Sequence, residues 1–292
     1  MKIVIHFGLH KTASSSFQTF LYLNRAALQD VGVFYPKIEN DKSHFQIPSG
    51  IIKNDWDFVK NFLNKAFEEA SNNKIKTVFI SSEDFETILI ENYRANQFEQ
   101  LAYEVGFSEV HWVGVLRSQW DYFNSLYAQL SSDGASLNYS AMGHDIIHYG
   151  YISIGTGTFR WQFAFDYDLF FDRFLENISG SLSLYTFDSF VENEFIGDKI
   201  INSIIDDKNL EIIFWESIIN QVNKANPRID STTVEINYLA NFLGIKMSNE
   251  FYSQNQKIFG PLVEYRQSLI GPAREELHKK FLERFPIISN KV

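Results

Sequence analysis

Residues 2–16 read KIVIHFGLHKTASSS, and this stretch decides the predicted fold. An apolar, β-branched run ends at Gly8, and the turn that follows carries a lysine, a threonine and three consecutive serines. A strand that leads through such a turn into a helix is typical of the first unit of an α/β sheet. The start of that helix brings together backbone N–H groups and the positive end of the helix dipole, which favour a bound anion. The stretch therefore predicts a strand, a helix and an anion-binding loop between them.

The first half of the chain repeats this alternation of short β-branched runs and longer amphipathic stretches. The expected strands are at 2–7, 33–35, 76–81 and 110–116, and the second of them ends before Pro36. The expected helices are at 15–30, 55–71, 93–105 and 119–130. Strands that alternate with helices in this way form βαβ units. The sequence thus predicts an α/β fold with a central, mostly parallel sheet flanked by helices.

The second half of the chain predicts a mainly helical part. Residues 131–151 are rich in Gly, Ser, Asn and Tyr, which favours a surface loop with a little helix, a gate-like insertion at about 131–158. Further on we expect a helix at 161–176, a strand at 182–185, mainly helices from 188 onward, and a loop at 226–230 before a helix at 232–242 with Asp230 or Ser231 as its N-cap. No repeat, low-complexity tract or linker divides the chain. The expected organisation is a single domain over 1–292 with a helical C-terminal part.

The composition places the chain among globular proteins and excludes several kinds of site. Hydrophobic residues make up 45% and aromatic residues 16% of the 292 residues, enough for a large core. The absence of cysteine excludes disulfides, thiolate nucleophiles and Cys-ligated metal centres. A net charge of −10 argues against nucleic acid as a partner, since that attraction depends on neutralising phosphates. With no apolar stretch of about 18 residues and only a short apolar run at the start, we expect a cytoplasmic protein without an integral membrane segment.

The turn after the first strand supplies the candidate binding residues. They are His10, Lys11, Thr12, Ala13, Ser14, Ser15 and Ser16. A lysine acts as a point charge for a phosphate or sulfate oxygen, and hydroxyls donate to the remaining oxygens. A serine-rich helix start alone would indicate an ordinary N-cap, whereas the preceding strand and the inserted lysine favour an anion site. The turn is not a Walker A motif, because Gly-x-x-x-x-Gly-Lys-Ser/Thr is absent and the lysine precedes the hydroxyls, which weakens a kinase or NTPase interpretation.

Residues 10–18, HKTASSSFQ, resemble the 5′-phosphosulfate loop of sulfotransferases, enzymes that use 3′-phosphoadenosine-5′-phosphosulfate (PAPS). The resemblance implies a P-loop-like fold in which a lysine, a small residue and successive hydroxyls wrap the phosphosulfate. It covers most of the chain, although the specific motifs occupy fewer than ~30 residues. The family most often has Gly where this chain has Ala13. If that position requires a positive φ, alanine costs about 1 kcal/mol there.

A second motif lies at the end of the strand expected at 110–116. Arg117 follows this strand directly, and Ser125 follows Arg117 by eight residues. An arginine at a strand end is by itself more often part of a surface ion pair. Sulfotransferases have an Arg and a Ser at this spacing that hold the 3′-phosphate of the nucleotide, so the resemblance implies that role for Arg117 and Ser125. The planar fork of arginine suits the role, because it binds phosphate through two hydrogen bonds.

Two residues are candidates for the catalytic base. Glu83 lies just past the strand expected at 76–81, at the edge of an open α/β sheet where ligands bind. His44 lies after the preceding strand, and sulfotransferases commonly carry a catalytic His or Glu at one of these two places. The alternatives are an N-cap or ion-pair role for Glu83 and an ordinary loop position for His44. The sequence does not separate the two candidates by geometry. Lys11 is the expected partner of the leaving phosphate.

The reaction that the resemblance implies is transfer of a sulfuryl group from PAPS to a hydroxyl or amine of a carbohydrate, lipid or small molecule, which gives adenosine 3′,5′-bisphosphate. The alternatives are a P-loop-like small-molecule kinase and a non-catalytic nucleotide-binding protein. His144 and His148 have the i, i+4 spacing of a metal-binding helix face, but no third ligand is evident nearby, so we expect no metal. The sequence leaves the acceptor and the oligomeric state open.

Overall fold

The structure is a computed structural model of the 292-residue chain, and it describes residues 1–39, 41–155, 161–191, 195–205, 208–218, 230–244 and 253–285. These residues group into two compact units by their contacts. The first unit is formed mainly by Met1–Arg117 and Ser153–Asn226, and the second by Ser118–Ile152 and Pro227–Ile288. The single domain expected over 1–292 stays a prediction, and each unit is described by itself.

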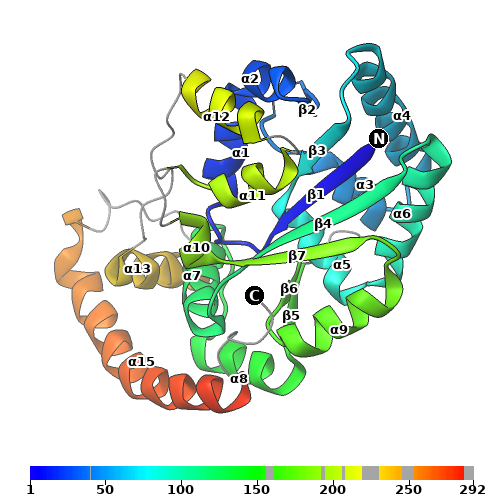
Figure 1. The fold of residues 1–292 in the computed structure, drawn as a ribbon. Coiled ribbons are helices and arrows are strands. Elements are labelled where there is room, and N and C mark those ends of the chain that lie inside the picture. The colour runs from blue at the N-terminus through cyan, green and yellow to red at the C-terminus, as the bar shows by residue number, and fades with distance from the viewer. Residues whose placement is uncertain are drawn as a thin grey trace. The chain divides into compact units, whose positions relative to one another are not determined.

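A five-stranded sheet forms the centre of the first unit (Figure 1). Its strands are β1 (Lys2–Gly8), β2 (Val33–Phe34), β3 (Thr77–Ser81), β4 (Glu109–Leu116) and β7 (Ser181–Thr186). They are arranged in the order β2-β3-β1-β4-β7, and every pairing is parallel. The predicted α/β fold with a parallel sheet is confirmed. Because all strands point the same way, the loops that follow them meet at one edge of the sheet.

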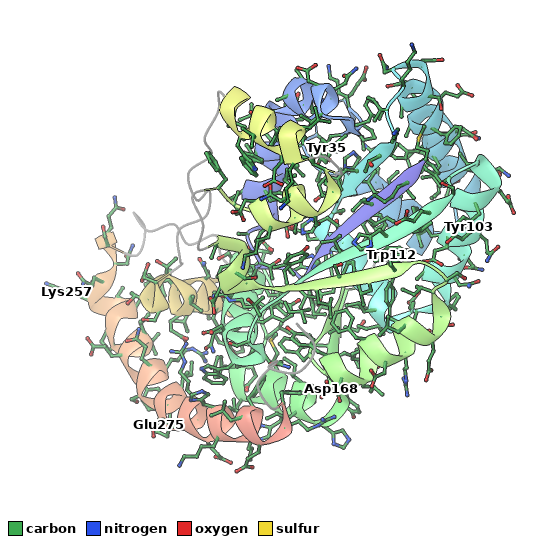
Figure 2. The ribbon with its side chains drawn as sticks, in the orientation of Figure 1. Tyr35, Tyr103, Trp112, Asp168, Lys257 and Glu275 are labelled. Atoms are coloured by element: carbon green, nitrogen blue, oxygen red, sulfur yellow. The ribbon has the colours of Figure 1, made fainter. Side chains whose placement is uncertain are left out.

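Side chains of β1 and β4 are buried on both faces of this sheet, as is usual for parallel strands covered by helices. Ile3, Val4 and Ile5 have no exposed surface. Trp112 in β4 is the centre of an aromatic cluster and lies 5.4 to 6.3 Å, between ring centroids, from the rings of Phe7, Phe85, Phe98 and Phe174 (Figure 2). Most of these pairs meet edge to face, which stabilises aromatic contacts beyond the buried area alone.

The helices of the first unit alternate with its strands, as the sequence predicts, but their bounds differ in places from the expected ones. They are α1 (Ser14–Leu23), α2 (Arg25–Asp30), α3 (Gln46–Ile52), α4 (Trp56–Asn72), α5 (Thr87–Ile90), α6 (Tyr93–Val105), α9 (Tyr167–Asn177), α10 (Phe187–Val191), α11 (Asp198–Ile204) and α12 (Lys208–Ser217), with a 3₁₀ turn, η1, at Glu83–Glu86. The single helix expected at 15–30 is wrong, because Asn24 leaves helical geometry at φ −103° and ψ 20°. Its side-chain amide donates to the carbonyl oxygen of Phe20 (2.9 Å), a local bond that competes with helix continuation.

The helix expected at 161–176 is wrong in its first part, where the structure has a strand of a second, two-stranded sheet. Its strands are β5 (Tyr151–Ile154) and β6 (Trp161–Ala164). The helix α9 begins only at Tyr167, because the carboxylate of Asp166 accepts a hydrogen bond from the N–H of Leu169 (3.1 Å) and forms the N-cap. Aromatic side chains fit a strand as well as a helix, so their spacing does not separate the two.

The second unit consists of helices. They are α7 (Gln119–Ser132), α8 (Tyr139–Tyr149), α13 (Ser231–Leu243) and α15 (Gln256–Arg284). The segment 131–151, expected to be a surface loop with a little helix, is helical over more than half its length. The reason is the N-cap Asn138, whose side chain accepts from the N–H of Ala141 (2.9 Å) and starts α8.

The C-terminal helices expected from 188 onward are confirmed for the described residues. Asp230 is the N-cap of α13, as predicted, and accepts from the N–H of Thr233 (2.9 Å). The remainder of the loop expected at 226–230 lies outside the described residues. Within the ranges given above, no helix is both long and apolar enough to cross a membrane.

Candidate active site

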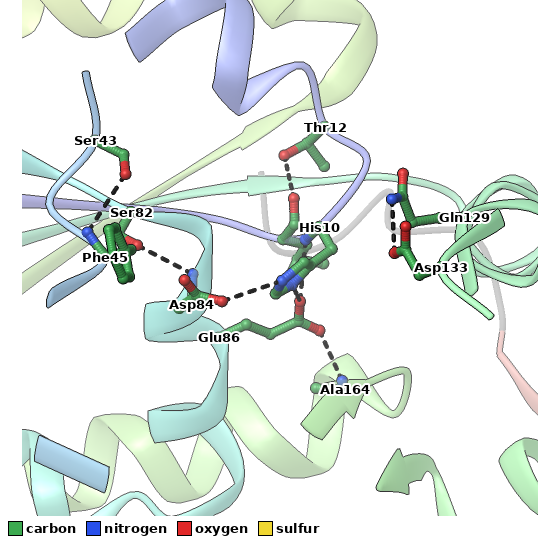
Figure 3. Close-up of polar contacts among 11 residues, drawn as sticks. His10, Thr12, Ser43, Phe45, Ser82, Asp84, Glu86, Gln129, Asp133 and Ala164 are labelled. Atoms are coloured by element: carbon green, nitrogen blue, oxygen red, sulfur yellow. Dashed lines mark hydrogen bonds and ion pairs between the residues drawn. The ribbon is translucent and has the colours of Figure 1, made fainter. Parts of the chain in front are cut away.

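The predicted binding turn lies at the carboxyl end of β1, and we refer to residues 8–16 as the anion loop. The hydroxyl of Thr12 donates to the carbonyl oxygen of Leu9, and the N–H of Thr12 donates to the same oxygen (3.3 Å) (Figure 3). The N–H of Leu9 donates to the carbonyl of Val115 in β4 (3.4 Å). The loop is therefore tied to the neighbouring strand, at the sheet edge where ligands of α/β folds bind.

Two residues of the anion loop have a left-handed backbone. Lys11 has φ 64° and Ala13 has φ 62°, a region that side chains with a Cβ rarely adopt. This conformation costs roughly 1–2 kcal/mol per residue. Position 13 therefore has a positive φ, a conformation in which glycine would be less strained than alanine. Backbone strain of this kind is concentrated at functional sites.

The start of α1 leaves hydrogen-bond donors open. Ala13 is the N-cap residue, and no side chain caps the helix. The N–H groups of Ser16 and Phe17 both donate to the carbonyl of Ala13 (3.1 Å each). Within the described residues, the N–H groups of Ala13, Ser14 and Ser15 have no acceptor. Three adjacent open donors at a helix start form a cradle that suits a tetrahedral anion.

Hydroxyl side chains line the same turn. Ser14 and Ser16 are buried and Ser15 is exposed. Gly8 makes the close packing possible, because a Cβ on Gly8 would lie 2.1 Å from the Oγ of Ser14 and 2.9 Å from the Oγ of Thr12. A larger residue at position 8 would therefore displace the two hydroxyls from the turn.

A buried carboxylate holds His10. Glu86, at the end of η1, has no exposed surface, and its Oε2 accepts from the backbone N–H (3.0 Å) and from Nδ1 (2.9 Å) of His10 (Figure 3). The other oxygen, Oε1, accepts from the N–H of Ala164 in β6 (2.8 Å). A second carboxylate, Asp84, has its Oδ1 3.5 Å from Nε2 of His10. His10 thus lies between two carboxylates, one for each ring nitrogen.

These contacts set the charges of the site. Burial alone would lower the pKa of His10, but the hydrogen bonds to Asp84 and Glu86 raise it to about 10, so the ring is an imidazolium at neutral pH. Burial raises the pKa of Glu83 above its ordinary value; the cations His10 and Lys11 oppose this shift, and the neighbouring carboxylates add to it. Within the described residues, the Glu83 carboxylate forms no hydrogen bond or ion pair. Glu83 is therefore an unengaged carboxyl group beside two cations.

His44 is held by the backbone. Its Nδ1 accepts from the N–H of Ser81 (3.1 Å), and its Nε2 is 3.1 Å from the carbonyl oxygen of Pro36, to which it donates. The ring is 1% exposed and meets Tyr35 edge-on at 4.6 Å between centroids. Burial lowers the pKa of His44 to about 4. Both ring nitrogens are engaged, so this geometry favours a structural role over proton abstraction from an acceptor.

His6, in β1, is the other fully buried histidine. Its Nδ1 is 2.8 Å from the Oγ of Ser81, and its Nε2 has no hydrogen-bond partner within the described residues. The ring packs edge-on against Phe17 at 5.1 Å between centroids. Burial lowers the pKa of His6 to about 3, so the ring is neutral at physiological pH.

Arg117 ends β4 and contacts the anion loop directly. Its Nη1 donates to the carbonyl oxygen of Lys11 (2.8 Å), and its guanidinium lies over the ring of Phe187 at 4.8 Å from the centroid. The carbonyl oxygen of Arg117 accepts from the hydroxyl of Tyr167 (2.9 Å). Arg117 and the anion loop therefore belong to one hydrogen-bonded site in the first unit.

Ser125 lies in α7, which belongs to the second unit, so its pairing with Arg117 stays a prediction. His144 and His148 lie in α8. The Nδ1 of His144 donates to the carbonyl of Ser140 (2.8 Å), and its Nε2 is 3.3 Å from Nζ of Lys280. In the described part of the chain, no three metal-ligating side chains lie together in a cluster that could hold a metal ion.

Glu86 is the site residue that the sequence reasoning missed. The only signal for it was the density of acidic residues in 83–86, which read EDFE directly after a strand. The site that emerges in the first unit combines a strained loop with open N–H donors, two cations and a carboxyl group of raised pKa. Comparisons of the chain with models of protein families, with characterised proteins and with solved structures find no match.

Proposed function

We propose that this chain is a PAPS-dependent sulfotransferase that acts on a hydroxyl or amine of its acceptor. The observation that carries the proposal is the anion loop, whose N–H groups at Ala13, Ser14 and Ser15 point to no protein acceptor within the described residues. The loop lies at the carboxyl edge of a parallel sheet, and the side chains of Lys11 and three serines accompany it. These residues fit a phosphosulfate, because its oxygens need several donors and a positive charge. When bound, PAPS supplies the sulfuryl group that is transferred.

Lys11 is the group we assign to the leaving phosphate. A positive charge placed where negative charge develops lowers the barrier of a transfer reaction, since it stabilises the transition state more than the ground state. The left-handed backbone of Lys11, at φ 64°, sets the direction in which its side chain leaves the loop. Its carbonyl oxygen is held by Arg117 (2.8 Å), so this strained conformation is braced from the neighbouring strand.

Glu83 is the group we assign as general base. It follows β3 at the same sheet edge as the anion loop, and its carboxylate is not consumed by another hydrogen bond in the described residues. A general base works best when its pKa is closer to the operating pH than that of an ordinary carboxylate, and burial raises the pKa of Glu83 in this direction. His44 is the less suitable base, because both of its ring nitrogens are bonded to the backbone.

Arg117 is the residue of the first unit that we assign to the 3′-phosphate of the nucleotide, and a role of Ser125, in the second unit, stays a prediction of the resemblance. The guanidinium of Arg117 is positively charged and presents its N–H groups in a planar fork, a geometry that suits a phosphate. The assignment predicts that the chain distinguishes nucleotides with a 3′-phosphate from those without one.

The test is calorimetric titration of the protein with adenosine 3′,5′-bisphosphate in the presence of a metal chelator, compared with ATP and ADP with and without Mg²⁺. We expect binding of the bisphosphate without metal and weaker binding of ATP. A screen of sugar, lipid, phenol and peptide acceptors with labelled PAPS then identifies the acceptor. Tight Mg²⁺-dependent binding of ATP would instead indicate a small-molecule kinase. Binding of the bisphosphate without transfer to any acceptor class would indicate a non-catalytic nucleotide-binding protein.

A further inference from the structure

Glu86 connects three segments that are distant in the sequence. Its two oxygens accept from the backbone and ring of His10 in the anion loop and from the backbone of Ala164 in β6. The Glu86 side chain is fully buried and so is its bond to Ala164, so water does not supply a substitute acceptor for that backbone N–H. A neutral side chain at this position would remove the charged acceptor from all three N–H groups.

The chain contains a second carboxylate with nearly the same surroundings. Glu99, in α6, is also fully buried, and it accepts from the ring N–H of Trp112 (2.7 Å) and from the backbone N–H groups of Ser179 (2.6 Å) and Gly180 (3.2 Å). Each glutamate thus accepts from one ring nitrogen and from two backbone donors. The difference is that the ring of Trp112 cannot take up a proton, whereas the ring of His10 can.

The groups around His10 come from three elements, and two of these contribute charges. The turn η1 contributes Glu83, Asp84 and Glu86. The anion loop contributes Lys11, the residue that follows His10. From β6, His10 meets only an aromatic ring, that of Phe163, edge-on at 4.9 Å between centroids. Tyr167, at the start of α9, is a further titratable group near Glu86, and burial holds its pKa far above the neutral range.

We propose that Glu86 is a positioning residue that keeps His10 positively charged and holds the anion loop in its strained conformation. The proposal rests on the proposed function only in treating this loop as the anion site. The charged ring beside Lys11 then provides a second fixed cation for the anion, and its backbone N–H is held by the same carboxylate. This role explains why two carboxylates face a histidine in a site that would bind anions. Without the carboxylates, burial would lower the pKa of His10 and the ring would lose its proton.

The experiment compares Glu86→Gln with the matched control Glu99→Gln. Both changes remove one negative charge from a fully buried site that accepts three N–H donors, so both are expected to lower stability. The proton titration of the His10 ring is followed by NMR between pH 5 and 10, and the affinity for inorganic sulfate is measured at pH 6, 7.5 and 9. Sulfate itself does not titrate in this range, so a pH dependence reports on the protein.

We expect wild type and Glu99→Gln to keep His10 charged through pH 8 and to bind sulfate with little change between pH 6 and 8. In Glu86→Gln the ring should lose its proton at lower pH. Sulfate affinity should then fall by roughly tenfold between pH 6 and 9, because the anion loses one nearby positive charge. A purely structural role predicts instead a similar loss of affinity at every pH.

A third variant keeps the proposal testable if Glu86→Gln does not fold. His10→Gln retains a side-chain donor for Glu86 and removes the charge. This variant should bind sulfate weakly, and its affinity should not change with pH through the titration of residue 10, because glutamine does not titrate. The proposal is wrong if His10 titrates alike in Glu86→Gln and Glu99→Gln, or if His10→Gln binds sulfate as wild type does. If His10 titrates as expected while no variant, nor wild type, transfers sulfuryl groups, the proposed function fails and the role of Glu86 stands.

Discussion

The Nη1 of Arg117 donates a hydrogen bond of 2.8 Å to the carbonyl oxygen of Lys11. This bond joins the two motifs that the sequence singled out separately, one after β1 and one after β4. It also braces a residue whose φ of 64° is unfavourable for a side chain. We therefore expect Arg117 to contribute to anion binding in two ways, directly through the positive charge of its guanidinium and indirectly through the shape of the loop.

Arg117→Ala should weaken binding of adenosine 3′,5′-bisphosphate by about 2–3 kcal/mol, the scale of a charge-assisted bond to a buried partner. The loss should be much smaller for an analogue without the 3′-phosphate, and calorimetry of both ligands measures the difference. Arg117→Lys is the control, because it keeps the charge and loses the planar fork. Equal losses for both ligands would show that Arg117 acts only by bracing Lys11.

Lys11→Ala should abolish sulfuryl transfer while the protein stays folded, because the lysine contributes mainly to the transition state. Lys74→Ala is a matched control: Lys74 has φ 57°, so both changes replace a lysine at a left-handed position by alanine. Turnover and thermal unfolding of the two variants are measured side by side. Near-normal turnover of a folded Lys11→Ala protein would remove the lysine from the mechanism.

Glu83→Gln should lose roughly 10²–10⁴-fold in kcat with little change in nucleotide affinity, as expected for a general base that faces the acceptor. Because burial raises the pKa of Glu83, the wild-type rate should increase with pH through that raised pKa. His44→Asn should lose less rate. It should instead lower the free energy of unfolding by about 1–3 kcal/mol, since the buried N–H of Ser81 loses its acceptor.

The measurement is kcat against pH for both variants on one acceptor, with urea unfolding alongside. If His44→Asn is the inactive enzyme and Glu83→Gln keeps most of its rate, the assignment of the base is reversed.

Ala13→Gly should raise the free energy of unfolding by roughly 0.5–1 kcal/mol. Glycine relieves the strain of φ 62°, and part of that gain is offset by the larger freedom of glycine in the unfolded chain. Ala27→Gly, inside the helix α2, is the control with the opposite sign, because glycine is unfavourable in a helix. Urea unfolding measures both. A loss of stability in Ala13→Gly would mean that the loop is not strained at this position.

Stability should fall on acidification because of two buried histidines. Burial lowers the folded-state pKa of His6 to about 3 and that of His44 to about 4, below the unfolded value of about 6.5. Their contribution is therefore complete above about pH 6.5 and is lost as the pH falls from there toward 4 and 3. His10 has the opposite sign, since its folded pKa is raised to about 10, and its contribution is lost as the pH rises from about 6.5 through 10.

Urea unfolding between pH 4.5 and 9.5 should thus show a maximum near neutral pH. His6→Phe, in a surrounding of Phe17 and Phe190, should flatten the acid side and leave the alkaline side unchanged. If the free energy of unfolding of this variant falls as steeply below neutral pH as that of wild type, His6 is excluded as a source of the pH dependence.

The sequence by itself determined the parallel sheet, the order of its strands with the helices, and the position of the anion loop. These features depend on the local period of apolar residues and on turn chemistry, which neighbouring residues encode. The prediction from sequence was wrong where the residues fitted two kinds of local structure equally well. Residues 161–164 form a strand and not the start of a helix, because Asp166 caps the helix later, and Asn24 breaks a helix that the pattern continued.

Only the tertiary structure decided the partners of the ionisable groups. Glu86 meets His10 across 76 residues of sequence, and His44 accepts from Ser81 across 37. The charge of a histidine depends on its burial and on the acceptors around it, and sequence spacing specifies neither. Histidine is therefore a cation at position 10, where the fold places two carboxylates beside the ring. It is neutral at position 44, where both ring nitrogens are hydrogen-bonded to peptide groups.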